Sequence, residues 1–240
     1  MPRPDTDILR NRLLSVLPEA DRELILADLE LIELPLGMKL AGRGEPIEHV
    51  YFLIDGIGSV VVTTPDGNRT EAGIFGFDGY IPTSAIAGVE ISSHDVIVMV
   101  AGTSYRMDYD RFRGWMGRNA NLSKVMIRSI EAFSVQLAYT ITSNAVHDVN
   151  TRLARWLLMC HDRVIGDEIG LTHDFIAAML AVRRSSVTSA LHVLEGHEFI
   201  RSKRGNVIIR DRKGLEAFAH DAYGEPEREF QRLMTGLFEN

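Results

Sequence analysis

The segment from Leu171 to Arg210 constrains this chain more than any other part of its sequence. It contains two helix-like segments separated by a short break, followed by two short apolar runs around a basic turn. In the second helix-like segment, apolar residues recur at i, i+3, i+4 and i+7: Val187, Ala190, Leu191 and Leu194. In the first, the matching apolar positions are Ile176, Met179 and Leu180. The two stripes can bury each other only if the helices cross, which predicts a helix-turn-helix.

The polar residues of these helices indicate DNA binding. Thr172 is placed to cap the first helix, and Asp174 lies in its first turn, where the helix dipole favours an acid. The polar face of the second helix carries Arg184, Ser185, Thr188, Ser189 and His192. Arginine and hydroxyl side chains near a helix N-terminus fit the DNA major groove, where arginine can pair bidentately with guanine. The alternative is an ordinary amphipathic helix with a solvated polar face.

The residues that follow favour the DNA-binding interpretation. Apolar runs at 199–200 and 207–209 flank Gly205-Asn206, a pair that favours a tight hairpin turn. The basic residues of this hairpin are Arg201, Lys203 and Arg204. A basic hairpin after a helix-turn-helix predicts a wing whose tip lies along the DNA phosphates.

The charge distribution supports the same interpretation. From Arg183 to Lys213 the chain carries eight Lys or Arg against three acids, a net of +5. Residues 1–146 carry 13 basic and 19 acidic side chains, a net of −6. The basic surface is therefore confined to the predicted DNA-binding segment, and nonspecific binding to nucleic acid by the whole chain is not expected.

Length and composition predict a cytoplasmic protein of two domains. The chain has 240 residues, of which 45% are hydrophobic, so it can bury a sizeable core. No apolar run approaches the ~18 to 20 residues that span a bilayer, and the N-terminus lacks signal-peptide features. The only cysteine, Cys160, excludes an internal disulfide and a four-thiolate cluster and fits a reducing compartment. Its apolar surroundings favour a buried inert thiol, and the adjacent His161 leaves a redox switch as the alternative.

In the N-terminal half of the chain, the pattern of apolar residues changes from helix-like to strand-like near Pro35. Residues 5–34 are expected to be helical, with an interruption at Pro18. From Leu36 to about Tyr109, short strand-like runs follow one another: HVYFLI, GSVVVTT, RTEAGIF, SHDVIVMVA and TSYRMD. The sequence Pro65-Asp66-Gly67-Asn68 is the clearest hairpin turn. Several short strands at regular spacing predict a compact β-barrel or roll.

Residues 119–145 return to a helical period and predict a dimerisation helix. The expected seam follows alternating four- and three-residue steps: Met126, Ile130, Phe133 and Leu137, continuing to Thr140 and Asn144. Ile141 is expected in the same contact. A polar residue at a seam position is a known device for fixing register and oligomeric state. The alternative is a helix packed on its own barrel. Dimerisation is favoured because helix-turn-helix modules usually bind two half-sites about one helical turn apart.

In this order of elements the chain resembles the cyclic-AMP receptor and fumarate-nitrate regulator (Crp/Fnr) superfamily over nearly its whole length. The most specific matches outside the helix-turn-helix are Gly44-Glu45, Tyr51-Phe52 and Gly56 in the predicted roll, and Asp148-Val149 with Arg152-Leu153-Ala154 after the long helix. The resemblance implies an α+β protein with a cyclic-nucleotide-binding-like β-roll, a long dimerisation helix and a C-terminal winged helix-turn-helix. The corresponding segments are 1–118, 119–146 and 147–215, with a helical tail at 216–240. The implied function is that of a homodimeric transcription factor on a palindromic promoter site, with RNA polymerase as a further partner.

The resemblance also suggests which residues contact DNA. The family's base-reading positions fall on Arg184, Ser185 and Ser189, and Thr172 resembles a phosphate contact. The expected DNA-binding set as a whole is Thr172, Arg183, Arg184, Ser185, Thr188, Ser189, Lys203 and Arg204. Well-known members have an acid and a second arginine where this chain has Ser185 and Ser189. Since a bidentate arginine contributes ~1 to 3 kcal/mol of base discrimination, the target sequence should differ.

The effector site departs further from the family. Cyclic-nucleotide binders carry Gly-Glu-Leu and then Arg-Ser/Thr-Ala, whereas this chain has GFDGY at 76–80 and SSHD at 92–95. The long helix places Leu137 and Ala138 where the cyclic-AMP receptor has hydroxyl residues. A buried phosphate without a cation is poorly compensated, so we expect no tight cyclic-AMP binding. A cavity for another ligand could be lined by Asp78, Tyr80, Ser92 and His94.

Cofactors and catalysis are not indicated. One cysteine is too few for an iron-sulfur cluster, and the eight scattered histidines favour neither haem nor a metal site. No spaced catalytic signature is present, which argues against an enzyme. A ligand-sensing or partner-binding protein of the same fold that has lost specific DNA recognition is the other alternative. The acidic tail, amphipathic around Phe230, Leu233, Met234 and Leu237, is either a helix packed on the dimer or a polymerase contact.

Overall fold

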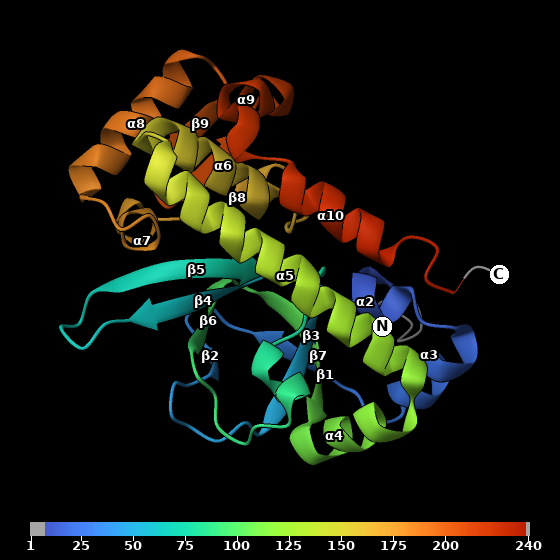
Figure 1. The fold of residues 1–240 in the computed structure, drawn as a ribbon. Coiled ribbons are helices and arrows are strands. Elements are labelled where there is room, and N and C mark those ends of the chain that lie inside the picture. Colours follow the sequence, from blue (N-terminus) through green and yellow to red (C-terminus); the bar gives the residue numbers. More distant parts are fainter. Residues whose placement is uncertain (1–7, 239–240) are drawn as a thin grey trace.

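The computed structural model describes residues 8–238, which form two bodies linked by the long helix α5 (Ala120–Val146) (Figure 1). A β-roll with short helices forms the first body. A group of helices with a small sheet forms the second. No helix within these residues combines the length and apolar character needed to cross a bilayer.

The N-terminal residues fold into short helices followed by a strand. The helices are the 3-10 helix η1 (Ile8–Arg10), α2 (Arg12–Ser15) and α3 (Glu19–Leu26). The buried Asn11 caps α2 and also donates to the carbonyl oxygens of Leu53 and Gly79, at 2.9 and 3.0 Å, which fixes this segment on the roll. Residues 5–7 of the predicted helical segment lie outside the described residues. The prediction was wrong for Glu30–Leu34, which forms strand β1 because it pairs antiparallel with β7.

The roll consists of two antiparallel sheets. Its other strands are β2 (Lys39–Ala41), β3 (His49–Leu53), β4 (Ile57–Thr63), β5 (Arg69–Phe75), β6 (Asp95–Val100) and β7 (Gly102–Asp108), with the 3-10 helix η2 (Thr83–Ala87) between β5 and β6. The strand orders are β1-β7-β3 and β2-β6-β4-β5. All five predicted strand-like runs are confirmed, as is the turn between β4 and β5. In that turn Gly67 has a φ of +85° and donates to the Thr64 carbonyl oxygen at 2.9 Å.

Helix α4 (Tyr109–Arg118) leads from the roll into α5, which Asn119 caps. The inner face of α5 packs on the roll through Leu122, Val125, Met126, Ser129, Ala132 and Gln136. Gln136 accepts from the Ile74 backbone N–H at 2.8 Å and donates to the Ile74 carbonyl at 3.2 Å. These bonds hold the middle of α5 directly against β5.

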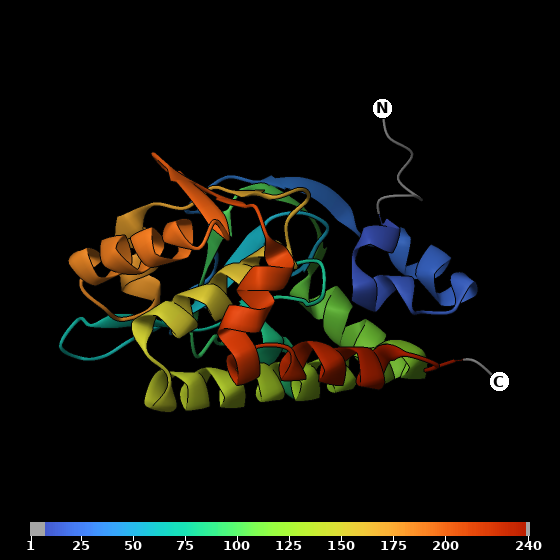
Figure 2. The same ribbon diagram turned by 90° about the horizontal axis from the view of Figure 1, so that it is seen from above.

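The second body starts with α6 and ends with η3, after which the chain returns to the first body. Its elements are α6 (Val149–His161), β8 (Glu168–Ile169), α7 (His173–Met179), α8 (Arg184–Gly196), β9 (Ile200–Lys203), β10 (Asn206–Ile209), α9 (Arg212–Ala219) and the 3-10 helix η3 (His220–Ala222). The last helix, α10 (Glu225–Met234), then runs beside α5, as both ribbon views show (Figures 1 and 2).

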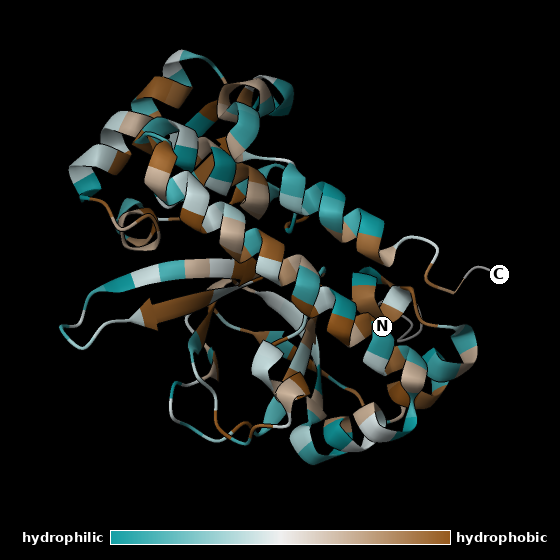
Figure 3. Ribbon diagram, viewed as in Figure 1, coloured by the Kyte–Doolittle hydropathy of each residue, from teal (hydrophilic) through white to brown (hydrophobic). Residues whose placement is uncertain are grey.

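The C-terminal tail returns to the first body from α10 onward. Arg128 of α5 donates to the Leu233 carbonyl oxygen at 2.8 Å, and Lys124 donates to that of Leu237 at 3.2 Å. Met234 and Leu237 join the apolar core of the N-terminal helices, while much of the remaining surface of α10 is hydrophilic (Figure 3). The helix of the tail is therefore packed on α5 of its own chain, and the two expectations, packing on the dimer and contact with polymerase, stay predictions.

Candidate nucleic-acid interface

Helices α7 and α8 pack as the sequence predicts. The predicted stripe of α8 is fully buried: Val187, Ala190, Leu191 and Leu194. It meets the buried Ile176, Met179 and Leu180 of the first helix. Thr172 caps α7, because its hydroxyl accepts from the Phe175 backbone N–H at 3.2 Å. The helix-turn-helix prediction is confirmed in its elements, stripes and cap.

The N-terminal part of α8 presents the predicted polar residues to solvent. Arg183, Arg184, Ser185 and Ser189 are exposed, and Thr188 is half-buried. The Thr188 hydroxyl donates to the Arg184 carbonyl at 3.2 Å and lies 3.2 Å from Nδ1 of His173. The Arg184 guanidinium is paired with both carboxylate oxygens of Asp174, at 2.8 and 3.0 Å, and both side chains are about two-thirds exposed. This pair holds Arg184 extended across the entrance of α7.

The hairpin after α8 forms the predicted wing with one difference in its turn. Strands β9 and β10 pair with Lys203 opposite Asn206, so the turn residues are Arg204 and Gly205 rather than Gly205 and Asn206. Gly205 has a φ of +80°, a conformation that disfavours side chains. The short strand β8, which the sequence did not predict, extends the wing to three strands in the order β8-β10-β9.

An open groove of about 730 Å³ brings parts of the predicted interface together. Thr172, Arg184, Lys203 and Arg204 all line it. Its wall is fixed by Glu195 of α8, whose carboxylate accepts from the Ser202 backbone N–H of β9 at 2.6 Å. The α7 entrance, the N-terminus of α8 and the basic wing therefore face one surface.

The DNA-binding body is docked on the roll through a buried polar contact. Trp156 of α6 donates its indole N–H to Glu71 of β5 at 2.6 Å, and the Ser59 hydroxyl donates to the other Glu71 carboxylate oxygen at 2.6 Å. Burial raises the pKa of Glu71 to about 7, although both hydrogen bonds oppose the shift. Around this contact one apolar core contains Ile57, Val61, Ile74 and Met99 of the roll together with α6, α7 and α8.

The sequence analysis missed Glu71, although a signal existed. Glu71 is a buried acid within β5, where it lies opposite Val61, and a bulge before Gly73 puts it on the same face as Ile74, toward α6. An acid on the inward face of an otherwise buried strand requires a partner from another element.

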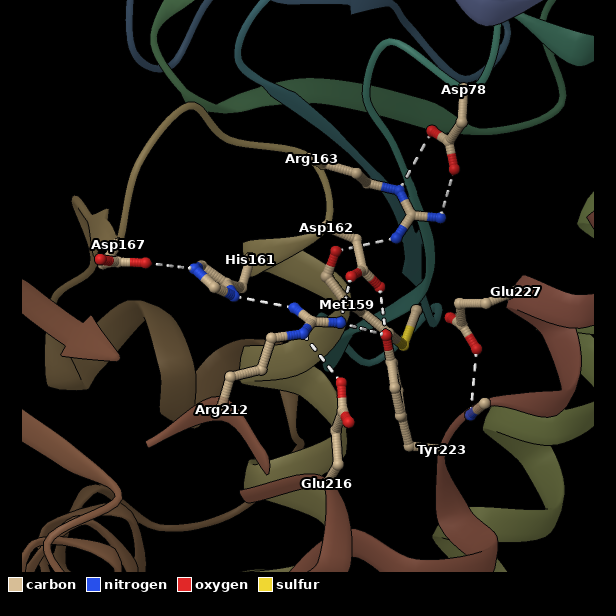
Figure 4. Close-up of polar contacts among 11 residues, drawn as sticks. Asp78, Met159, His161, Asp162, Arg163, Asp167, Arg212, Glu216, Tyr223 and Glu227 are labelled. Atoms are coloured by element: carbon tan, nitrogen blue, oxygen red, sulfur yellow. Dashed lines mark hydrogen bonds and ion pairs between the residues drawn. The ribbon is translucent and has the colours of Figure 1, made fainter. Parts of the chain in front are cut away.

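A second polar network joins the same bodies beside α10 (Figure 4). The buried Arg163 pairs with Asp78 of the roll at 2.6 Å and donates to the Met159 carbonyl at 2.8 Å. Arg212 of α9 donates to Asp162 at 2.6 Å and to the Tyr223 hydroxyl at 2.7 Å. These side chains line a cavity of about 260 Å³ between the roll, α5 and α10.

The four residues proposed for an effector pocket do not line one cavity. Asp78 faces Arg163, whereas the Tyr80 ring is fully buried near Phe52 and Phe112. The Ser92 hydroxyl is engaged with the His94 carbonyl at 2.8 Å, in a turn at the start of β6. The pocket expectation was wrong because Tyr80 belongs to the core and Ser92 to a local turn.

The expected dimer seam straddles two faces of α5. Met126 is fully buried in the core of the chain itself, Ile130 packs against the same core, and the Phe133 ring lies 4.2 Å from that of Phe75. Leu137 is half-buried, and Thr140 and Asn144 bond to Arg155 and Arg152 of α6, at 3.1 and 3.0 Å. Ile141, at 70%, is largely exposed, and Asn144 is exposed as well. The register of the prediction was therefore wrong for Met126 and Phe133, which pack inward.

Cys160 lies in the core, fully buried, and burial raises the pKa of its thiol well above the usual value. A buried thiol with a raised pKa has little thiolate, the form that reacts with oxidants. The structure agrees with the inert-thiol interpretation.

Comparisons with known proteins identify the C-terminal domain and a relative of the chain. The model of the Crp-like helix-turn-helix domain matches residues 151–218. A curated relative, the CRP-like cAMP-activated global transcriptional regulator of Mycobacterium tuberculosis, is 26% identical over 196 residues, covering 78% of this chain and 87% of the relative.

Solved structures share the fold at lower identity. FixK2 from Bradyrhizobium japonicum superposes with a TM-score of 0.67 at 15% identity, covering 81% of this chain and 99% of that one. A CRP/FNR family transcriptional regulator from Thermus thermophilus gives a TM-score of 0.64 at 18% identity, covering 81% and 100%. With the β-roll, the long helix and the winged helix-turn-helix in the same order, the chain carries a Crp-like helix-turn-helix domain and has the fold of Crp/Fnr transcriptional regulators.

Proposed function

We propose that this chain is a cytoplasmic homodimeric regulator that binds a two-fold-symmetric promoter site in a sequence-specific way and contacts RNA polymerase there. The observation that carries the proposal is the groove in which Arg184 of α8 and the basic wing face one surface. We assign the chain no catalytic role.

Within this proposal, the exposed residues at the start of α8 contact base edges. Arg184 supplies a bidentate contact to guanine, and Ser185 and Ser189 contact neighbouring bases. Arg184 must exchange its Asp174 partner for the base, a small cost because both groups are exposed and a surface ion pair contributes only ~0 to 1 kcal/mol. Arg183, Thr172, Thr188, Lys203 and Arg204 serve as backbone-positioning contacts.

The dimer contact we propose is the outer face of α5, one position away from the seam expected from sequence. Two large apolar residues on this helix are exposed, Ile127 at 60% and Ile141 at 70%. Exposed positions continue between and beyond them in alternating steps of four and three: Glu131, Ser134, Ala138 and Ala145. Such spacing is that of a coiled-coil seam, and α5 lies along one edge of the molecule with α10 beside it (Figure 2).

We propose that neither cyclic AMP nor an iron-sulfur cluster controls the protein, and its signal is left unassigned. The segment 76–95, where the family's cyclic-nucleotide binders carry arginine, contains no lysine or arginine. The middle of α5 also lies directly on β5, with Phe133 against Phe75. The interior of the roll is filled at Gly58, where an added Cβ would lie 2.6 Å from the side chain of Ile81.

The rival is a protein of the same fold that no longer recognises specific DNA. The test is selection of bound sequences from a random duplex library by full-length protein without added ligand. We expect the wild type to enrich a two-fold-symmetric site, Arg184→Ala to lose that enrichment, and Arg210→Ala, which removes an exposed arginine of the same body, to retain it. No enrichment by the wild type, or equal enrichment by Arg184→Ala, would reject the proposed role.

A further inference from the structure

The chain crosses between its two bodies at two points, and three potential metal ligands meet there. His147 follows the end of α5 and precedes α6. His220 and Asp221 lie in η3, between α9 of the second body and α10, which packs on α5. The two crossings are far apart in sequence and adjacent in space.

The geometry of the three side chains suits a small divalent cation. One ring nitrogen each of His147 and His220 and a carboxylate oxygen of Asp221 lie within 4.8 Å of one another. The His147 Nε2 to Asp221 Oδ1 distance is 3.2 Å, and Asp221 Oδ1 also contacts His220 Nδ1. In a tetrahedral site with bonds of about 2.0 Å, neighbouring ligand atoms are about 3.3 Å apart. The distance from His147 to Asp221 is therefore close to that of two ligands on one ion.

The surroundings of His147 orient its ring for metal binding. Its Nδ1 lies 3.1 Å from the hydroxyl of the buried Ser143, one turn back on α5. If Nδ1 donates this bond, Nε2 keeps a free lone pair facing Asp221. The His147 side chain is largely buried, whereas those of His220 and Asp221 are open to solvent, so an ion could enter from that side.

The backbone of His220 is held in a rarely occupied conformation. Its φ is +38°, and residues with a side chain seldom adopt positive φ. The rings of His220 and His147 are 5.5 Å apart and nearly perpendicular, at 81°. Such strain is found where a side chain must be presented to a partner.

From this placement we propose that His147, His220 and Asp221 form a site for a divalent first-row transition ion such as Zn²⁺. Two imidazoles and one carboxylate are ligands that these ions accept, with the remaining position open to water. The bound ion links the two crossings and so restrains the DNA-binding body against α5 and α10. The contrasting interpretation, in which Asp221 only pairs with the two histidines, needs no ion.

The test uses full-length, tag-free protein, first treated with a chelator and then dialysed. Zn²⁺ is titrated by calorimetry, and Co²⁺ is followed by its visible absorption, which reports imidazole ligation and coordination number. We expect one ion per chain. His220→Ala and Asp221→Asn should weaken binding at least tenfold, and Zn²⁺ should raise the unfolding temperature of the wild type but not of His220→Ala.

A matched control is His94→Ala, which removes an exposed histidine of the roll outside the cluster. It should bind Zn²⁺ as the wild type does. His147→Gln provides a second ligand variant if His220→Ala fails to fold. Absence of stoichiometric binding by the wild type, or equal affinities in the wild type and all ligand variants, would overturn the proposal and leave a metal-free His-Asp-His cluster.

Discussion

The indole N–H of Trp156 in α6 donates to the carboxylate of Glu71 in β5 at 2.6 Å, inside the core that the roll shares with the helix-turn-helix. This bond joins the domain expected to sense a signal to the domain that contacts DNA. Because burial brings the pKa of Glu71 to about 7, the charge at this junction changes within the physiological pH range.

The pKa of Glu71 predicts how stability depends on pH. Its ordinary value is 4.5, and in the folded protein it is about 7. Between these values the folded state holds a proton that the unfolded chain has lost, so the free energy of unfolding should fall as pH rises. The total effect is about 3 kcal/mol across this window. Glu71→Gln imitates the protonated acid and should remove this dependence.

Urea unfolding of the wild type and Glu71→Gln at pH 5 and pH 7.5 measures the difference. The comparison between the two proteins cancels the contributions of other titrating groups. The same pH dependence in both would mean that Glu71 titrates normally and is not desolvated at the junction.

Removing the charges of the wing should change the salt dependence of DNA binding. Lys203 and Arg204 are exposed beside the groove, and each phosphate contact contributes about 0.9 to the slope of log affinity against log salt. The double variant Lys203→Ala/Arg204→Ala should therefore lose affinity for selected and random duplexes by similar factors, with a shallower slope. Anisotropy titrations at several salt concentrations test this. Arg113→Ala, in α4, should leave the slope unchanged, and a loss confined to the selected sequence would argue for base contacts instead.

Charges on the outer face of α5 should separate the proposed dimer. Ile127→Asp and Ile141→Asp place an acid at exposed apolar positions, where burial against a second copy would desolvate it. Sedimentation should show a dimer for the wild type and a monomer for either variant. Ile165→Asp, at an exposed isoleucine outside α5, is the control. If the two α5 variants stay dimeric, another surface forms the contact.

Calorimetry with cyclic AMP should show no tight binding. The segment 76–95 offers no lysine or arginine for the phosphate, and an uncompensated buried anion is strongly disfavoured. Micromolar affinity would contradict this expectation and would require a basic residue from outside the segment.

The parts of the fold that were predictable from sequence are those decided by local patterns. The strands around Pro65-Asp66-Gly67-Asn68 and the stripe from Val187 to Leu194 follow from turn chemistry and periodicity, because both signals are contained in a short stretch of sequence. The turn of the wing lies one residue earlier than predicted, because glycine suits more than one position of a tight turn.

The errors share a physical cause, since contacts distant in sequence decided them. Glu30–Leu34 has apolar spacing that also fits a helix, and only its pairing with β7 makes it a strand. Helix α5 carries apolar residues on two faces. The sequence alone therefore could not show which of Met126 and Ile127 packs on the roll and which faces outward. Likewise, no local pattern relates His147 to His220.

The return of α10 to α5 determines which motions the DNA-binding body can make. A domain attached by one linker can rotate about any axis, but this one is attached at His147 on entry and near His220 on exit. As long as α10 stays packed on α5, the DNA-binding body can rotate only about the axis that passes through those two attachments. Any change in the orientation of this body that follows a signal is therefore a rotation about that one axis, unless α10 first detaches from α5.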